Sequence, residues 1–76
     1  MNTQDQVMQT IAETLNIPLS TIDKDSAAEN MDTWDSFAQV NLMMALEQTF
    51  DITLDVEDII KLNSVASITA FIEKNS

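Results

Sequence analysis

The sequence has 76 residues, of which 45% are hydrophobic, and its 13 acidic and three basic residues give a net charge of −10. A chain of this length has room for a single domain, residues 1–76, and is too small for a deep catalytic cleft. Cysteine and histidine are absent, which excludes thiol and imidazole nucleophiles, the usual zinc ligands and every catalytic triad that needs histidine. The charge disfavours nucleic acid and anionic membranes as partners and favours basic protein surfaces.

The first predicted element is an amphipathic helix over residues 3–15, with Thr3 as its expected N-cap. Its apolar residues, which share one face at helical spacing, are Val7, Met8, Ile11 and Leu15. Pro18 follows the helix, and residues 18–35 are rich in Ser, Thr, Asn and Asp, which is typical of a long connection. Two apolar residues are expected to hold this loop against the core, namely Ile22 and Met31.

The second predicted helix covers Ser36–Phe50, with Asp35 as its N-cap. This helix has apolar residues on two nearly opposite sides. One side, expected to face the core, carries Leu42, Met43, Leu46 and Phe50, and the other carries Phe37, Val40 and Met44. Because one apolar side suffices for a core, the second side is free for binding a partner, unless the long loop folds over it.

The remaining third of the chain predicts an extended loop and two more helices. Residues 51–54 alternate like a strand but have no pairing partner, so an extended loop is expected there. A short helical turn follows over Val56–Lys61, and Ser64 is expected to cap a last helix. The apolar residues of this last helix are Val65, Ile68, Phe71 and Ile72. The predicted fold is therefore all-α: a small four-helix bundle, with three longer helices and one short helix, and a long loop between helices one and two.

Ser36 is the residue whose position has the clearest chemical meaning. It lies in the first turn of the second helix, where unpaired backbone N–H groups and the helix dipole favour an attached anion. Asp35 beside it can cap the helix and can also help to hold a divalent ion brought by a modifying enzyme, because hard cations prefer carboxylate and phosphate oxygens. The same dipeptide occurs at Asp25-Ser26, but there it is followed by Ala-Ala and not by an amphipathic helix.

A larger pattern around Ser36 resembles the acyl carrier protein family over about half of the chain. In that family the Ser of an Asp-Ser-Leu motif carries 4′-phosphopantetheine at the start of helix two. The matching residues, which keep the family's spacing without a gap, are Asp35-Ser36-Phe37, Val40, Leu42, Met44-Ala45-Leu46-Glu47, Phe50-Asp51, Ile52, Leu54, Val65 and Ile68. The resemblance implies a carrier and not an enzyme.

The resemblance also implies the chemistry of the carrier. A phosphopantetheinyl transferase would move the arm from coenzyme A to Ser36, and the thiol of the arm would hold an acyl group as a thioester. The carried chain could fold back between helix two and the later helices, against residues that otherwise read as ordinary core: Met43, Leu46, Ile59, Leu62, Ile68 and Phe71. The flexible Met43 side chain would suit such an adaptable lining.

The expected partners are the transferase and the acyl-loading and acyl-processing enzymes, which would present basic docking surfaces. The residues expected to dock on them are Phe37, Val40, Met44 and Glu47, with further acids at Asp35, Asp55, Glu57 and Asp58. The chain is expected to be a monomer. It shows no secretory signal and no apolar stretch that approaches the roughly 20 residues of a membrane span, so a cytoplasmic location is expected.

The sequence departs from the carriers of bulk fatty-acid synthesis at four positions. Three positions that are often acidic in those carriers are uncharged here: Ala38, Asn41 and Gln48. The fourth departure is Trp34, since a small residue or Leu is commoner before the Asp-Ser pair in those carriers. These departures favour a specialised carrier, in lipid, surface-glycan or secondary-metabolite synthesis, with bulk fatty-acid synthesis as the alternative. Trp34 is compatible with a specialised stand-alone carrier and equally with a simple anchor for the loop.

Three other functions compete with that of an acyl carrier. An EF-hand over residues 51–58 is disfavoured, because apolar residues interleave with the acids and the turn Gly is missing. An unmodified helical adaptor would bind partners through its apolar face and would tolerate the loss of the Ser36 hydroxyl. An aminoacyl or peptidyl carrier of an assembly line would use the same arm with a different cargo.

Overall fold

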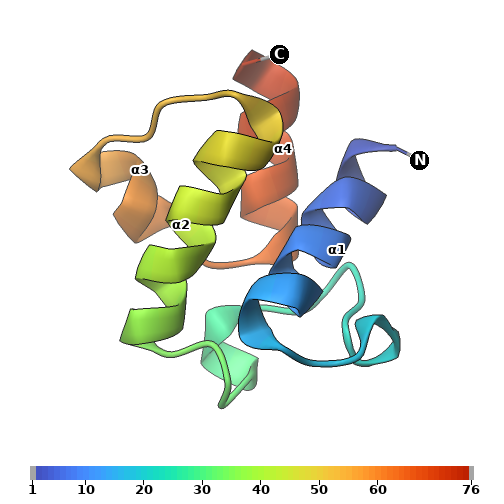
Figure 1. The fold of residues 1–76 in the computed structure, drawn as a ribbon. Helices are drawn as coiled ribbons and strands as arrows, with labels where there is room; N and C mark the ends of the chain where they lie inside the picture. The colour runs from blue at the N-terminus through green and yellow to red at the C-terminus, as the bar shows by residue number, and fades with distance from the viewer. Residues whose placement is uncertain (1, 76) are drawn as a thin grey trace.

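A computed structural model describes residues 2–75 of the chain. Its helices are α1 (Thr3–Leu15), α2 (Ser36–Phe50), α3 (Val56–Lys61) and α4 (Val65–Asn75), and two short 3₁₀ turns, η1 (Leu19–Thr21) and η2 (Ala28–Asn30), lie between α1 and α2. The predicted all-α bundle of three longer helices and one short helix is confirmed. In Figure 1, α1, α2 and α4 stand side by side, with α1 packed against both others, and α3 lies on the outer side of α2.

The helix starts follow from side-chain caps. The Asp35 carboxylate accepts a hydrogen bond of 2.9 Å from the N–H of Ala38, so the predicted cap of α2 is confirmed. At α1 the prediction was wrong by one residue: Asn2, and not Thr3, is the N-cap, and its Oδ1 accepts a bond of 2.8 Å from the N–H of Asp5. Asn caps as well as Ser or Thr do, so the sequence allowed either start.

The two longest helices end without glycine. Asn16 after α1 and Asp51 after α2 both adopt the left-handed conformation, with φ of 57° and 54°. Asn and Asp tolerate this region better than most residues, because their short polar side chains bond locally. A chain that has no Gly can therefore still turn sharply at both helix ends.

The core lies between α1, α2 and α4. Its largest fully buried side chains are Val7, Ile11, Leu42, Leu46, Val65 and Ile68. These residues recur at helical spacing, which is why an amphipathic pattern alone places them on inward faces. Ile22 from the long connection is also buried, as predicted, whereas Met31 is only partly buried and packs against the edge of the core.

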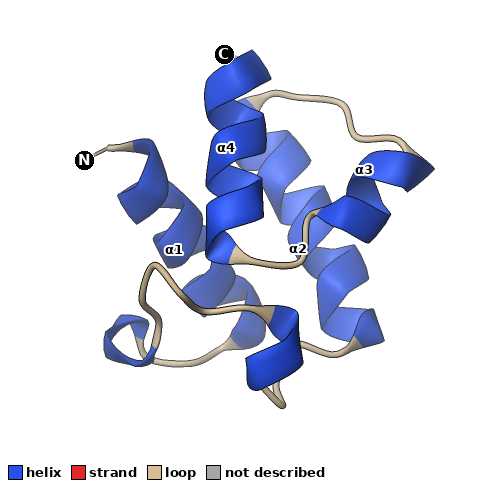
Figure 2. Ribbon diagram, turned by 180° about the vertical axis from the view of Figure 1, so that it is seen from behind, coloured by secondary structure: helices blue, strands red, loops and turns tan. Residues whose placement is uncertain are grey.

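The long connection between α1 and α2 is tied to the start of α4. The N–H of Ala28 donates to the carbonyl of Asn63 (2.8 Å), and the N–H of Val65 donates to the carbonyl of Ser26 (2.9 Å). Figure 2 shows this connection crossing one end of the bundle beneath α4. The path delivers the chain to the start of α2 with Trp34 turned inward, where only 3% of its surface is exposed. None of the helices within residues 2–75 has the length and apolar content needed to cross a bilayer.

Candidate functional site

Ser36 is the first residue of α2 and is exposed to solvent. The N–H groups of the first turn have no acceptor within the helix, and the Asp35 carboxylate occupies only that of Ala38. The N–H groups of Ser36 and Phe37 therefore remain available, at the positive end of a helix of 15 residues. An anionic group attached to the Ser36 hydroxyl would be stabilised there.

Ser26, in the second Asp-Ser pair, has a different environment. It is 7% exposed, and its hydroxyl oxygen accepts a hydrogen bond of 3.0 Å from the N–H of Asp23. The hydroxyl is thus part of a closed turn, and only the short 3₁₀ turn η2, not an α-helix, follows it. Of the two Asp-Ser pairs, only Asp35-Ser36 presents its hydroxyl to solvent at the start of an α-helix.

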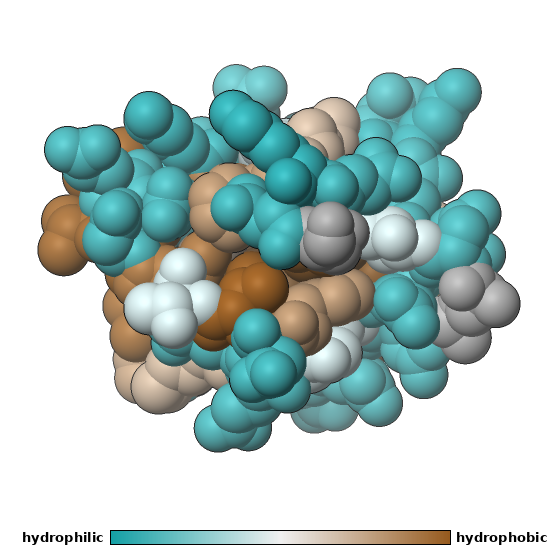
Figure 3. Space-filling view, turned by 90° about the horizontal axis from the view of Figure 1, so that it is seen from above, coloured by the Kyte–Doolittle hydropathy of each residue, from teal (hydrophilic) through white to brown (hydrophobic). Residues whose placement is uncertain are grey.

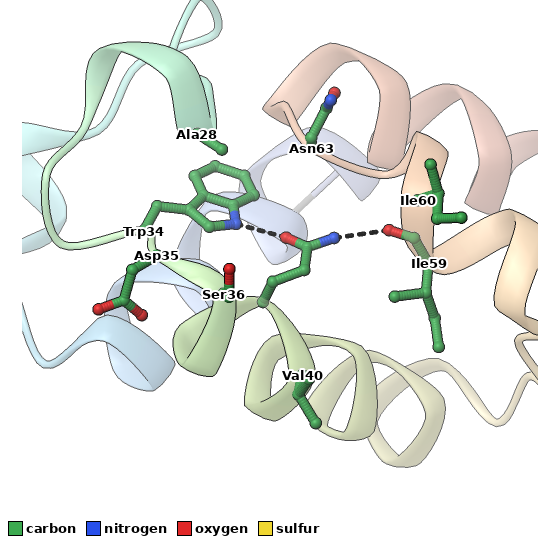
Figure 4. Close-up of a pocket in the computed structure, with 9 residues that line it drawn as sticks. Ala28, Trp34, Asp35, Ser36, Val40, Ile59, Ile60 and Asn63 are labelled. Carbon is green, nitrogen blue, oxygen red and sulfur yellow. Dashed lines mark hydrogen bonds between the residues drawn. The ribbon is translucent and has the colours of Figure 1, made fainter.

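An open groove of about 540 Å³ begins at Ser36. Figure 4 shows the Ser36 hydroxyl directed toward the groove, with the Asp35 carboxylate pointing outward at its edge. The walls come from the end of the long connection, the start of α2 and the C-terminal end of α3, and the lining residues are Ala28, Trp34, Asp35, Ser36, Gln39, Val40, Ile59, Ile60 and Asn63. Most of this lining is apolar, so the groove could hold a slender, partly apolar group attached to Ser36.

A chain of hydrogen bonds runs through the groove wall. The indole N–H of Trp34 donates to Oε1 of Gln39 (2.6 Å), and Nε2 of Gln39 donates to the carbonyl oxygens of Ile59 and Leu62 (2.8 Å each); the bonds from Trp34 and to Ile59 are dashed in Figure 4. The amide has only one orientation that works, because a flipped amide would set its oxygen against two carbonyls. The burial of Trp34 fits the predicted loop anchor, and this bond adds a link to α2.

Gln39 was missed by the sequence analysis. A glutamine inside a helix is normally solvent-exposed, as Gln48 is on the same helix. Nothing in the sequence around Gln39 indicates that its side chain is partly buried. Its partners at Ile59 and Leu62 are backbone carbonyls, 20 and 23 residues further along the chain. Backbone groups carry no sequence signature, so only the folded structure shows this link.

The second apolar side of α2 is open to solvent. Phe37 is 77% exposed, Val40 55% and Met44 51%, so the long connection does not fold over them. Two apolar residues of α3 that were not predicted are also exposed, namely Val56 (72%) and Ile60 (69%), and Ile60 lines the groove together with Val40. In Figure 3 hydrophobic surface is seen at the left, on the side of α2 and α3, and in a strip near the middle of the view, and most of the rest is hydrophilic. The five residues are called the apolar face below.

The six residues predicted to line a cargo pocket lie in or against the core. Four are almost completely buried, with exposed fractions of 3% or less: Met43, Leu46, Leu62 and Ile68. Ile59 and Phe71 are partly buried and pack against them. Among the six, only Ile59 lines the groove beside Ser36. A carried chain could reach the other five only if α2 and the later helices separated.

The acidic residues near the site have structural partners. Asp55 and Asp58 form a reciprocal capping box at the start of α3, with hydrogen bonds of 2.9 and 3.3 Å. Glu47 is partly buried and accepts a hydrogen bond from the N–H of Leu54. Two acids of the stretch after α2 therefore serve helix capping, and no group of three or more acidic side chains within residues 2–75 is arranged to hold a metal ion.

Comparisons with known proteins agree with this geometry. A family model described as "Phosphopantetheine attachment site" matches residues 5–72. The chain is 34% identical over 67 residues to an acyl carrier protein of Exiguobacterium, covering 88% of this chain and 85% of that protein. It is 33% identical over 75 residues to an acyl carrier protein of Buchnera aphidicola, covering 99% and 94%. An alignment with the acyl carrier protein of Akkermansia muciniphila reaches 43% identity over 51 residues, 67% of this chain but only 56% of that protein.

Solved structures show the same fold. A holo acyl carrier protein from Nitrosomonas europaea superposes with a TM-score of 0.81 at 28% identity, over 99% of this chain and 96% of that one. A holo acyl carrier protein from Geobacter metallireducens gives a TM-score of 0.82 at 23% identity, over 97% and 85%. At 23% identity the second match supports the fold alone. Both describe small helical bundles of the same arrangement.

Proposed function

We propose, from the premise that this chain belongs to the acyl carrier protein family, that it carries acyl groups on a 4′-phosphopantetheine arm attached to Ser36. Members of this family are carriers and not enzymes, and their prosthetic group is 4′-phosphopantetheine. When bound, the arm supplies the thiol that holds the acyl group as a thioester, which the chain cannot do itself because it has no Cys.

The observation that carries the assignment to Ser36 is its contrast with Ser26. Ser36 combines an exposed hydroxyl, available N–H groups at a helix start and an adjoining groove of about 540 Å³. Ser26 has a buried hydroxyl that accepts a bond within its own turn. The residues around Ser36 therefore fit a phosphodiester-linked arm, with the helix start beside the phosphate and the groove beside the rest.

The apolar face is the proposed docking surface for the transferase and for the enzymes that load and process the acyl group. Phe37, its most exposed side chain, directly follows Ser36 on α2, so a bound enzyme would have the attachment site within reach. The net charge of −10 would steer the protein toward basic surfaces on those enzymes. Since coenzyme A and such enzymes are found in the cytoplasm, a cytoplasmic location is part of the proposal.

The proposed cargo belongs to a specialised lipid or secondary-metabolite pathway more than to bulk fatty-acid synthesis. On α2 two positions where an acid would extend a negative docking surface, Asn41 and Gln48, are uncharged, and Ala38, the third departure, is buried. Glu47 lies between them, and its carboxylate is bonded to the loop. The docking surface of α2 is thus apolar rather than acidic, which favours partners that recognise shape and hydrophobic contact.

Intact mass spectrometry tests the function. The wild-type protein is incubated with coenzyme A and a phosphopantetheinyl transferase of broad specificity, beside the variants Ser36→Ala and Ser26→Ala. We expect the wild-type and Ser26→Ala proteins to gain the mass of one phosphopantetheinyl group and Ser36→Ala to gain none. A wild-type protein that stays at its polypeptide mass, or a Ser36→Ala variant that is modified, would contradict the proposal. The mass of the cargo on protein isolated from its own cell would identify the pathway.

A further inference from the structure

The amide of Gln39 joins three segments of the chain beside Ser36. It accepts from the Trp34 indole and donates both of its hydrogens to the carbonyl oxygens of Ile59 and Leu62. These bonds hold two segments against α2, namely the end of the long connection at Trp34 and the C-terminal end of α3. Because both donors are used, the amide has none left for another group.

Gln39 also lies where the groove meets the core. On one side of its contacts, Ile59 lines the groove; on the other, Leu62 is 3% exposed and belongs to the core. A carried chain that moved from the groove into the core would have to pass between α2 and α3. It would then break the bonds of Gln39 and leave two carbonyl oxygens and the Trp34 N–H without partners, which is unfavourable in a buried place.

We infer that Gln39 is a specificity-determining residue that keeps the carried chain in the groove and out of the core, and thereby restricts efficient carriage to short acyl groups. The inference rests on the carrier function proposed above. With the three bonds intact, the core residues Leu46 and Ile68 are packed against their neighbours, with exposed fractions of 1% and 0%. A long chain left in the open groove would keep much of its apolar surface in water, so it gains little from the protein.

The test compares a short and a long cargo on the same carrier. Wild-type protein, Gln39→Ala and Gln39→Glu each receive an acetyl- or octanoyl-4′-phosphopantetheinyl group from the matching acyl-coenzyme A and a transferase, with release of adenosine 3′,5′-bisphosphate, and loading is verified by intact mass. Hydroxylamine then cleaves the thioester, and the rate is followed by mass spectrometry. Gln39→Glu keeps the side-chain shape but removes both donors to Ile59 and Leu62. Gln48→Ala is the matched control, an exposed glutamine on the same helix.

For the wild type and Gln48→Ala we expect acetyl and octanoyl thioesters to be cleaved at the same rate. For Gln39→Ala and Gln39→Glu we expect the octanoyl thioester to be cleaved at least about fivefold more slowly than the acetyl thioester. The octanoyl chain can then enter the core between α2 and α3, where its thioester is protected from hydroxylamine. NMR spectra compare the octanoyl form of each protein with its acetyl form. The amide signals of Leu46 and Ile68 should differ between the two forms in the two Gln39 variants and coincide in the wild type.

Two results would overturn the inference: a wild-type protein that protects octanoyl several-fold over acetyl, or Gln39 variants that protect neither. Even if a variant does not fold, the wild-type measurement still tests whether the octanoyl chain stays out of the core. Melting curves identify a variant that does not fold. Failure of the carrier function is seen earlier and separately, as a wild-type protein that acquires no mass from either acyl-coenzyme A. The single Trp34 gives a further signal, since loss of its partner should shift its fluorescence.

Discussion

The carboxylate of Glu47 accepts a hydrogen bond of 2.8 Å from the backbone N–H of Leu54. Glu47 lies in the last part of α2 and is partly buried, and Leu54 lies in the loop before α3 with 8% of its surface exposed. The bond holds this loop along α2 and lets Leu54 join the core. An acid that the family pattern assigns to partner docking therefore has a structural partner within the chain.

We expect Glu47→Ala to lower the free energy of unfolding by about 1 to 2 kcal/mol, because the Leu54 N–H loses an ionised acceptor. Urea unfolding followed by circular dichroism measures this. Glu13→Ala is the control: it removes the same charge from an exposed position near the C-terminal end of α1 and should leave stability nearly unchanged. Equal stability of the two variants would contradict a structural role for Glu47.

Asp35 has a capping role that can be separated from any role toward a transferase. Asp35→Ala should destabilise the protein by about 1 kcal/mol, whereas Asp35→Asn should retain most of the stability, since Asn also caps. Asp25→Ala removes an exposed carboxylate that caps no α-helix and serves as the control. If Asp35 also helps to hold a divalent ion, Asp35→Asn should be modified more slowly at Ser36 despite its stability. Unfolding curves that show no loss for Asp35→Ala would exclude the cap as a stabilising feature.

Phe37 and Phe50 lie on the same helix, but replacing each by Ala is expected to have opposite effects on stability and on modification by the transferase. Phe37 is 77% exposed, so Phe37→Ala should hardly change the melting temperature but should lower kcat/KM of the transferase, if the apolar face is the docking surface. Phe50 packs against the core, so Phe50→Ala should cost about 2 to 4 kcal/mol of stability. Transferase kinetics and thermal melts of the two variants check both statements. Unchanged kinetics for Phe37→Ala would argue against docking at this face.

The helices could be predicted from the sequence because each carries its signal locally. The bounds of α2 follow from Asp35 as a cap and from the apolar spacing after it, and both sides of that helix were assigned correctly. The exposed position of Ser36 follows from the same local pattern. The cap of α1 was misplaced because Asn2 and Thr3 are both good caps in adjacent positions.

The parts that could not be predicted depend on contacts between distant segments. The link from Gln39 to α3 uses backbone carbonyls, and the exposure of Val56 and Ile60 follows from how a helix of six residues is placed against α2. A short helix has too few turns for its apolar pattern to define an inward face. The cargo pocket also could not be predicted from the sequence. The helical spacing of Leu46 and Ile68 is the same whether they pack in a closed core or line a pocket.

Added salt should stabilise the protein. At a net charge of −10 the folded chain repels itself, and counterions reduce this repulsion. We expect the melting temperature to rise by several degrees between low and moderate sodium chloride, and to rise further with a divalent cation at the same ionic strength. Sucrose at equal osmolality controls for general solute effects. A melting temperature that is independent of salt would show that the acidic residues do not strain the fold.

Thr69 on α4 is the place where the core itself can be improved. It is 8% exposed, and its hydroxyl oxygen is buried without a hydrogen-bond partner among residues 2–75. Valine has nearly the same shape and no group to desolvate, so Thr69→Val should raise the free energy of unfolding by about 1 kcal/mol. Thr10 on α1 gives a matched contrast, because it is 6% exposed but its hydroxyl donates to the carbonyl of Gln6 at 2.8 Å. Thr10→Val should therefore bring a smaller gain or a loss, and urea unfolding of both variants measures the difference. A larger gain at Thr10 than at Thr69 would mean that the unpaired hydroxyl is not what limits stability at this position.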